Sequence, residues 1–383
     1  MATKGTTAII GWESPIAIHP GEFLEEILKE YNLSQIELSE RIGISQKVIN
    51  EIISGKNPVT RPTAFKLSKI FPMAADYWVN LQQSYENDKA RIEEKDRLKK
   101  EVVTYLSHFQ ETYKELSIIG SSYGVSGLRW TARNYNNIAF ELQKFFAVDS
   151  LAYVKKGAER FAFRRYKRDN LNPYTLAAWL RIGEIKAQKT EVAVFSEEKL
   201  KDNLSVLRSL SREKHAEYLP KIEKLLADCG IVVVYMPHMK NTHTQGASKW
   251  ITPNKVLLML NTHRRDEGKF WFNLFHEIGH ILLHSKKEFF VDVEDGDESE
   301  VEKQANNFSQ KWLIPDFKNT LEEFKRHFHE SHNLNLAIQA AANKNGVSRA
   351  IVAGRFTNEF KNDAKIYPLM SRFLKNKVDY VNV

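Results

Sequence analysis

The segment of this chain best suited to chemistry is residues 275–280, which read Phe-His-Glu-Ile-Gly-His. Four residues make about one helical turn, so His276 and His280 project from the same face of a helix. Two imidazoles placed in this way can bind one divalent metal ion, most often Zn²⁺. Glu277 lies one step around the helix, where its carboxylate can act as the catalytic base. The sequence therefore predicts a zinc site; the alternative is that both histidines are packing residues of a buried helix.

A zinc site of this kind needs a third protein ligand. His284 continues the histidine stripe, but it lies about 12 Å along a straight helix from His276, too far for both to bind one ion. Glu302 is the better candidate, because it shares a helix face with Asn306 in a segment that can pack against the histidine helix. Glu300 is the competing carboxylate, and it belongs to an acidic run typical of a solvated loop.

These motifs resemble those of the ImmA/IrrE family of metallopeptidase-like domains. The similar strings are Phe-Trp-Phe-Asn-Leu-Phe-His-Glu-Ile-Gly-His-Ile-Leu-Leu-His at 270–284, Glu-x-x-Ala-Asn-x-Phe at 302–308 and Leu-Ile-Pro at 313–315. The resemblance covers roughly residues 171–360. It implies that His276, His280 and Glu302 bind zinc and that Glu277 is the catalytic glutamate. Gln304 departs from the family pattern, which often has an acidic residue there, and this departure leaves the predicted ligands unchanged.

The elements that must position these ligands are a mixture of helices and strands. Helices are predicted at 173–185 and 200–229, and strands at 231–236, 246–250 and 256–261. In zincin-like folds, a strand beside the metal can align an extended peptide through main-chain hydrogen bonds. The segment 248–250 is the candidate for such an edge, or else an ordinary strand of the sheet. A helix–Gly346–helix pattern at 340–355 is expected to pack on the zinc domain rather than to bind DNA.

A second functional pattern lies near the N-terminus. Helices are predicted at 35–42 and 46–53, and Gly43 between them allows the sharp turn of a helix-turn-helix. Ser34 and Glu37 form a capping box for the first helix. In this arrangement the first residues of the second helix reach base edges in the major groove. The predicted base-reading residues are Ser45, Gln46, Lys47 and Asn50, and the predicted phosphate contacts are Lys56 and Arg61.

Several motifs of this region, in the same order, are similar to the antitoxin branch of the Xre/Cro helix-turn-helix family, the HigA type. They are His-Pro-Gly-Glu-Phe-Leu at 19–24, Leu-Ser-Gln at 33–35, Gly-Ile-Ser at 43–45, Ile-Ile-Ser-Gly-Lys at 52–56 and Asp-Tyr-Trp-Val-Asn-Leu-Gln at 76–82. The resemblance covers about residues 16–85. It implies dimeric operator binding, autoregulation and a neighbouring toxin. A small helical bundle used for protein contacts is the alternative.

Composition limits the classes of function. With 383 residues the chain has room for two or three domains. The net charge of +8 agrees with nucleic-acid binding. No apolar run of about 18 residues occurs and the N-terminus lacks a secretory signal, so we expect no membrane span. The single cysteine, Cys229, excludes an intramolecular disulfide and fits a reducing, cytoplasmic setting.

The sequence thus predicts an α+β chain in four segments. These are an all-α helix-turn-helix DNA-binding domain at 12–83, a charged linker helix at 84–101, a helical connector at 102–170 and an ImmA/IrrE-like zinc domain at 171–383. The zinc domain is expected to be zincin-like, with a small sheet and the H-E-x-x-H helix.

The main functional hypothesis is a DNA-binding transcriptional regulator, an antitoxin-type autorepressor, whose zinc domain senses a signal or cleaves a protein. One alternative is an antitoxin that neutralises a toxin by binding while its zinc domain is catalytically silent. Another is a stand-alone zinc peptidase. The expected partners are double-stranded operator DNA, a second copy of the chain, and a toxin or a repressor-type protein substrate.

Overall fold

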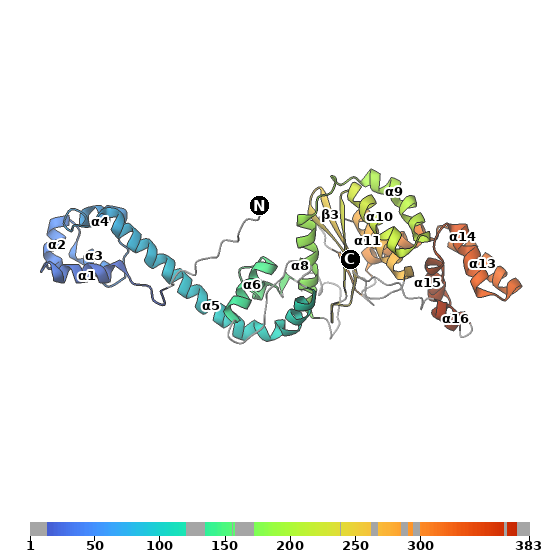
Figure 1. Cartoon of the computed structure of the whole chain (residues 1–383), viewed down its shortest axis with the longest axis horizontal. Helices are drawn as coiled ribbons and strands as arrows, with labels where there is room; N and C mark the ends of the chain where they lie inside the picture. The colour runs from blue at the N-terminus through green and yellow to red at the C-terminus, as the bar shows by residue number, and fades with distance from the viewer. Residues whose placement is uncertain are drawn as a thin grey trace, which may run out of the picture. The chain divides into compact units, whose positions relative to one another are not determined.

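The computed structural model describes residues 14–119, 135–154, 156–157, 172–237, 239–261, 267–284, 290–293, 299–363 and 366–373. Parts of the predicted connector, at 120–134, 155 and 158–170, lie outside these ranges. The chain divides into two compact units, Met1–Val103 and Thr104–Val383, which are described separately (Figure 1).

The first unit is an all-α bundle that forms around short capped helices. Its helices are α1 (Pro20–Glu30), α2 (Gln35–Ile42), α3 (Gln46–Ile53), α4 (Arg61–Leu67) and the first part of α5 (Ala75–Ile119). Leu24, Ile49 and Trp78 are fully buried in one shared core. Gly21 allows α1 to approach α3, because a Cβ atom there would lie only 1.9 Å from the backbone oxygen of Ile52.

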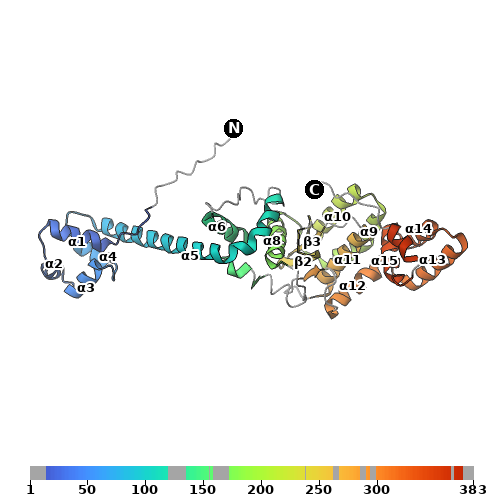
Figure 2. The same ribbon diagram turned by 90° about the horizontal axis from the view of Figure 1, so that it is seen from below.

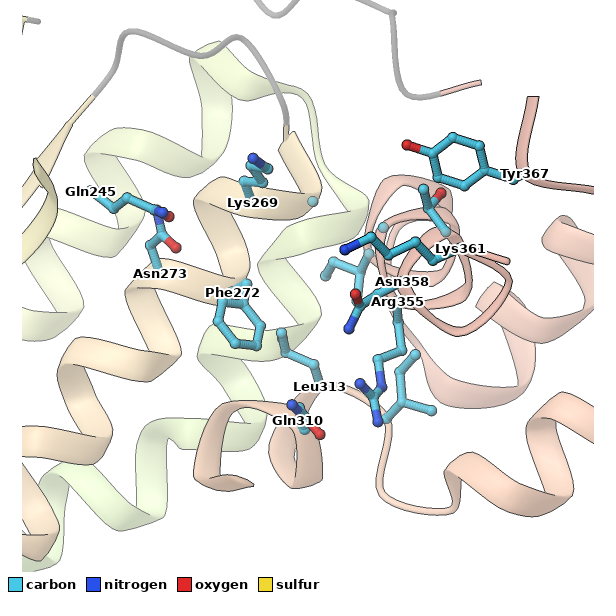
Figure 3. A pocket seen from close by; sticks show the side chains of 15 residues that line it. Gln245, Lys269, Phe272, Asn273, Gln310, Leu313, Arg355, Asn358, Lys361 and Tyr367 are labelled. Atoms are coloured by element: carbon cyan, nitrogen blue, oxygen red, sulfur yellow. The ribbon is translucent and has the colours of Figure 1, made fainter. Parts of the chain in front are cut away.

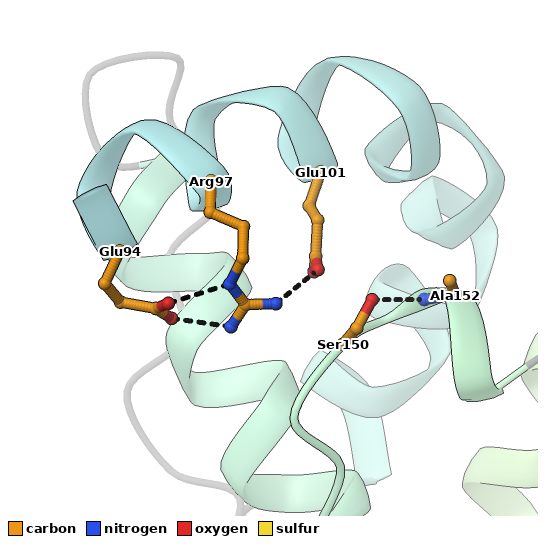
Figure 4. Close-up of polar contacts among 5 residues, drawn as sticks. All are labelled: Glu94, Arg97, Glu101, Ser150 and Ala152. Atoms are coloured by element: carbon orange, nitrogen blue, oxygen red, sulfur yellow. Dashed lines mark hydrogen bonds and ion pairs between the residues drawn. The ribbon is translucent and has the colours of Figure 1, made fainter. Parts of the chain in front are cut away.

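Helix α5 is one continuous element of 45 residues (Figure 2). The sequence predicts a short helix at 76–82, a linker helix at 84–101 and a connector from 102, whereas the structure joins these segments without a break. No glycine or proline interrupts residues 75–119, which explains the continuity. Ion pairs one turn apart add support: Arg97 binds both Glu94 and Glu101 (Figure 4).

In the second unit, the end of α5 packs on α6 (Tyr135–Phe146) and α8 (Pro173–Lys189). The ring of Phe109 lies 4.4 Å from that of Tyr174 and 5.7 Å from that of Phe146. After α6 the chain turns where the Ser150 hydroxyl accepts a hydrogen bond from the Ala152 N–H (Figure 4). Aromatic packing therefore supplies the core that the sequence predicts for the described part of the connector.

The sheet of the second unit has four strands in the order β1-β3-β2-β4. They are β1 (Ile231–Met236), β2 (Thr244–Thr252), β3 (Lys255–Asn261) and β4 (Phe290–Val293). Strands β1 and β3 are parallel, and β2 is antiparallel to both β3 and β4. Ser248 pairs with Phe290, so β4 covers the start of the predicted edge 248–250, and β4 is the outermost strand on this side of the sheet among the described residues.

Helices cover both faces of this sheet. Helix α8 lies on one face, and α10 (His215–Asp228) and α11 (Glu267–Leu283) lie on the other (Figure 1). The remaining elements are α9 (Glu197–Ser209), η3 (Leu210–Arg212), α12 (Glu300–Leu313), α13 (Phe317–Ser331), α14 (Leu334–Asn345), α15 (Arg349–Glu359) and α16 (Ile366–Phe373). The pattern around Gly346 is the α14–α15 pair, and α15 buries Val352 and Phe356 in the core of the C-terminal domain, as predicted.

The architecture is α+β, as predicted: an N-terminal helical bundle and a C-terminal domain with a small sheet. Within the described residues, no helix combines the length and the apolar character needed to cross a membrane.

Candidate metal centre and nucleic-acid interface

The central helix of the candidate metal centre is α11, whose residues 273–281 are all buried. It packs closely against α12. Gly279 makes this approach feasible, since a Cβ atom there would lie 3.2–3.3 Å from atoms of Phe308 and Ala305. The hydroxyl of Ser309 also donates a hydrogen bond to the backbone oxygen of Phe272, which fixes the register of the two helices. This packing brings the histidine face of α11 against the first turns of α12.

Three buried side chains converge at this contact. The Nε2 atoms of His276 and His280 lie 2.9 Å apart, and Glu302 Oε2 lies 3.1 Å from the first and 3.3 Å from the second. All three ligand atoms fall within 4.8 Å of one another, and they form the one potential metal-binding cluster found among the described residues. Two imidazole nitrogens and a carboxylate oxygen are the donor set of a zinc site that keeps a fourth position for water or substrate. The donors present therefore fit a divalent metal ion.

Residues behind the ligands hold them in the required orientation. His276 Nδ1 lies 3.0 Å from Asn306 Oδ1, a contact that orients the ring so that Nε2 faces the cluster. The ring of His280 stacks on Phe290 of β4, with centroids 4.4 Å apart and planes 11° apart. Ser299 caps α12 by accepting a hydrogen bond from the backbone N–H of Glu302. Such outer contacts fix ligand geometry before a metal binds.

The electrostatics of the cluster keep both kinds of ligand in the form that binds metal. Burial lowers the pKa of His280 to about 4, although Glu302 opposes the shift. Burial raises the pKa of Glu302, but hydrogen bonds to His276 and His280 outweigh it, so the net pKa lies below the usual range of a carboxyl group. At neutral pH His280 is therefore neutral and Glu302 is ionised, as metal coordination requires.

Glu277 lies next to the cluster and is completely buried. Strand β2 passes directly over its carboxylate: a Cβ atom on Gly246 would lie 2.5 Å from Glu277 Oε1. Glycine at this position leaves room for the carboxylate between the strand and α11. The sequence places Gly246 in a strand, but its local pattern contains no signal that a glutamate 31 positions away needs this space.

The other residues considered for the metal centre do not belong to the cluster. Glu300 is exposed and forms an ion pair with Lys303. Gln304 is exposed and is not part of the cluster. The ring of His284 is tilted against those of His280 and Phe290, with centroids 5.3 Å from each, and His284 is also outside the cluster.

The helix-turn-helix of the first unit has its own well-defined geometry. Ser34 and Glu37 form the predicted capping box of α2. Gly43 adopts φ +60° and ends α2, and Ser45 caps α3 by accepting from the backbone N–H of Val48. Glycine tolerates this left-handed conformation, so α3 can start directly after the turn.

The six predicted DNA contacts all point to solvent. Helix α3 buries Ile49 and Ile52 and exposes its polar face. The exposed residues are Ser45, Gln46, Lys47 and Asn50, together with Lys56 and Arg61 beyond the helix. The structure thus presents the first turns of α3 as a polar, accessible surface, the arrangement that a groove-reading helix needs.

A helix-turn-helix unit joined to a zincin-like domain defines the class of this protein. Two family models match the chain accordingly. The helix-turn-helix model matches residues 24–78, and the IrrE N-terminal-like domain model matches residues 227–357, which include the His-His-Glu cluster and Glu277.

Two relatives show how far the similarity extends. Virulence-associated protein I of Dichelobacter nodosus is 40% identical over 82 residues, which are 20% of this chain and 76% of that protein. The uncharacterized HTH-type transcriptional regulator YbaQ of Escherichia coli strain K12 is 30% identical over 104 residues, which are 26% of this chain and 91% of that protein. The chain belongs to the helix-turn-helix family of transcriptional regulators and carries an IrrE N-terminal-like peptidase domain in addition.

Solved structures of the HigA type are also similar. The Pseudomonas aeruginosa antitoxin HigA with the higBA promoter has 32% identity and a TM-score of 0.19, over 19% of this chain and 82% of that one. An addiction module antidote protein of the HigA family from Coxiella burnetii has 30% identity and a TM-score of 0.21, over 22% of this chain and 94% of that one.

Proposed function

We propose that this protein is an autorepressing transcriptional regulator whose C-terminal domain is a zinc-dependent endopeptidase acting on a repressor-type protein. The observation that carries the proposal is the convergence of His276, His280 and Glu302 on one buried point beside Glu277. The chain places this centre in the same molecule as a helix-turn-helix unit with an exposed reading surface.

The proposed chemistry assigns one role to each group. Zn²⁺ held by His276, His280 and Glu302 would act as a Lewis acid toward a peptide carbonyl and would acidify water. Glu277 accepts the proton of the attacking water and returns it to the leaving amine. Its buried position under β2 fixes the carboxylate and shields it from bulk solvent.

The metal assignment is tested by elemental analysis of the purified full chain. We expect about one zinc per wild-type chain and little or none in Glu302→Gln. The matched control is Glu300→Gln, since Glu300 sits on the same helix but is exposed and paired with Lys303. Retention of zinc by Glu302→Gln would refute the ligand set.

The catalytic assignment needs a separate measurement. The linker is rich in charge and the repressor-like domain is fused in the same chain, so the first substrate to test is the protein itself. We expect zinc-dependent cleavage by the wild type and none by Glu277→Gln that still contains zinc. If the chain and the candidate repressors stay intact under all conditions, the proposed peptidase activity is refuted and the C-terminal domain is not catalytic.

The DNA-binding assignment concerns Ser45, Gln46, Lys47 and Asn50 as base readers. A duplex from the promoter of the protein's own gene is the probe. Joint replacement of Gln46, Lys47 and Asn50 by alanine should abolish its recognition, since each base contact is worth roughly 1–3 kcal/mol. Lys56→Ala or Arg61→Ala should weaken binding to all DNA sequences alike. Each change should also reduce the slope of log affinity against log salt concentration by about one. Unchanged promoter affinity in the triple variant would contradict the reading role of α3.

A second candidate is an antitoxin that binds a toxin and has no catalytic activity. The HigA-type motifs at 16–85 favour it. In both cases we propose a homodimer, because two copies of α3 would read the two half-sites of an operator. Sedimentation of the protein–DNA complex measures this directly, and one chain per operator would contradict it.

A further inference from the structure

A cavity of about 420 Å³ lies beside the metal centre, between α11, the end of α12, α15 and α16 (Figure 3). This volume falls within the range of sites for small molecules. Neither the cluster residues His276, His280 and Glu302 nor Glu277 line it. The cavity is therefore distinct from the proposed zinc site, and its chemistry has to be derived from its own walls.

The charge of these walls has one sign. Lys269, Arg355 and Lys361 line the cavity, and no aspartate or glutamate does so in the part of the chain that the structure describes. Four side-chain amides add hydrogen-bond donors: Gln245, Asn273, Gln310 and Asn358. Figure 3 shows Lys361 and Asn358 extending from the α15 side toward Phe272 on α11. A wall with three cations and several amides is suited to an anion.

Arg355 is held in place rather than freely solvated. Its guanidinium lies over the ring of Phe317, with 4.3 Å between Cζ and the ring centroid. Burial lowers the pKa of Arg355, and the charge of Glu359, which does not line the cavity, opposes that shift. The side chain therefore meets a ligand without the full entropic cost of being ordered.

Much of the remaining wall is apolar. It includes Phe272, Leu313, Ile314 and Ile351, while Thr357 and Tyr367 add two hydroxyl groups. An inorganic anion fits this surface poorly, because its charge would be buried against hydrocarbon. The surface suits a ligand that has a flat or apolar body and one charged end. We propose that this cavity binds a small organic anion, one that carries a carboxylate, sulfonate or phosphate group on an aromatic or apolar body.

The position of the cavity connects its occupant to the metal centre. The ring of Phe272, which lines the cavity, lies 6.1 Å from the ring of His276 one turn along α11. Gln245, also in the wall, precedes Gly246, the residue that covers Glu277. A bound anion thus contacts both elements that hold the catalytic groups, although its binding does not depend on the zinc assignment.

The probe for this site is 8-anilinonaphthalene-1-sulfonate, an aromatic anion whose fluorescence rises in apolar surroundings. We expect one saturable site per full-length chain. Lys361→Glu reverses a charge at an exposed position and should weaken binding at least tenfold, as the loss of a charged hydrogen bond would. Arg355→Gln should have a similar effect. The matched control is Lys318→Glu, which makes the same charge change at an exposed residue outside the cavity.

Two further arms complete the test. N-phenyl-1-naphthylamine has the same aromatic body without the sulfonate. We expect the wild type to bind it at least tenfold more weakly than the anionic probe. Its affinity for Lys361→Glu should equal its affinity for the wild type. Glu302→Gln should bind the anionic probe like the wild type, so a failure of the zinc assignment would not affect this result. Wild-type affinity of the anionic probe for both Lys361→Glu and Arg355→Gln would overturn the proposal, as would equal affinity of the two probes for the wild type.

Discussion

His276 is held from behind by Asn306, whose Oδ1 lies 3.0 Å from Nδ1 of the imidazole. We expect Asn306→Leu to lower the zinc affinity of the protein about 10–100-fold, because the ring would lose the group that fixes its orientation. Asn306→Asp keeps an acceptor at the same place and should bind zinc at least as well as the wild type. Competition with a fluorescent chelator measures both variants, and equal affinities of wild type and Asn306→Leu would contradict this role.

Single residues also show where sequence reasoning stops. His276, His280 and Glu277 follow from spacing within one helix, since the helical period fixes which side chains share a face. Asn306 shares a predicted face with Glu302, but its contact with His276 requires α12 to pack on α11. Gly246 carries no local signal at all, because the space it provides is used by a residue of another element.

At the scale of elements, the contact of α1 with α3 depends on Gly21. A Cβ atom there would lie 1.9 Å from the Ile52 backbone oxygen, and backbone cannot move aside as a side chain can. We expect Gly21→Ala to destabilise the first unit by about 1–3 kcal/mol or more, as overpacking does. Because α3 would shift, promoter binding should weaken too. Thermal unfolding measures the effect, with the exposed Glu26→Ala on the same helix as control.

The start of α1 provides a pH-dependent element. His19 caps the helix: its Nδ1 accepts a hydrogen bond of 2.9 Å from the Gly21 N–H, and its ring meets Tyr85 edge-on at 4.7 Å. Burial lowers the pKa of His19 below its ordinary value of 6.5, with Glu22 raising it and Lys89 lowering it. The unfolded chain therefore binds the proton more tightly than the folded one.

It follows that His19 should make the first unit less stable as the pH falls below about 6.5, while above that value its effect is constant. His19→Asn keeps a capping side chain that does not titrate in this range. We expect the stability difference between wild type and His19→Asn to change between pH 7 and 5, as measured by urea unfolding at each pH. Parallel pH profiles of the two proteins would rule out this role for the histidine.

At the scale of the whole molecule, the chain has two compact units with separate cores. The proposed zinc ligands all lie in the second unit. A ligand at about 1,000 times its Kd stabilises the folded state by about 4 kcal/mol. Removing zinc with a chelator should therefore lower the melting temperature of the second unit by roughly 10 °C and leave the first unit unchanged. Calorimetry of the full chain checks this, and a shift of both transitions or of neither would contradict it.

The family assignment and the α+β class follow from the sequence, and the family matches and the fold confirm them. Residues 75–119 form one helix where the sequence predicts separate helical segments, because local charge patterns do not reveal where a helix without glycine or proline stops. Of the two interpretations of 248–250, an edge or an ordinary strand, the sequence alone did not select one, and the structure pairs Ser248 with β4. Pairing between distant strands depends on the whole sheet and not on either strand alone.

The amino-acid sequence alone determined the caps and turn of the helix-turn-helix, the polar face of α3 and the one-turn spacing of His276 and His280, because these features arise within a few residues of one another. Only the tertiary structure decided that β2 lies over Glu277 at Gly246 and that Arg355 and Lys361 line one cavity with Phe272. These relations join elements far apart in the chain, and they are set by how helices and strands pack against each other, which no local pattern of residues encodes.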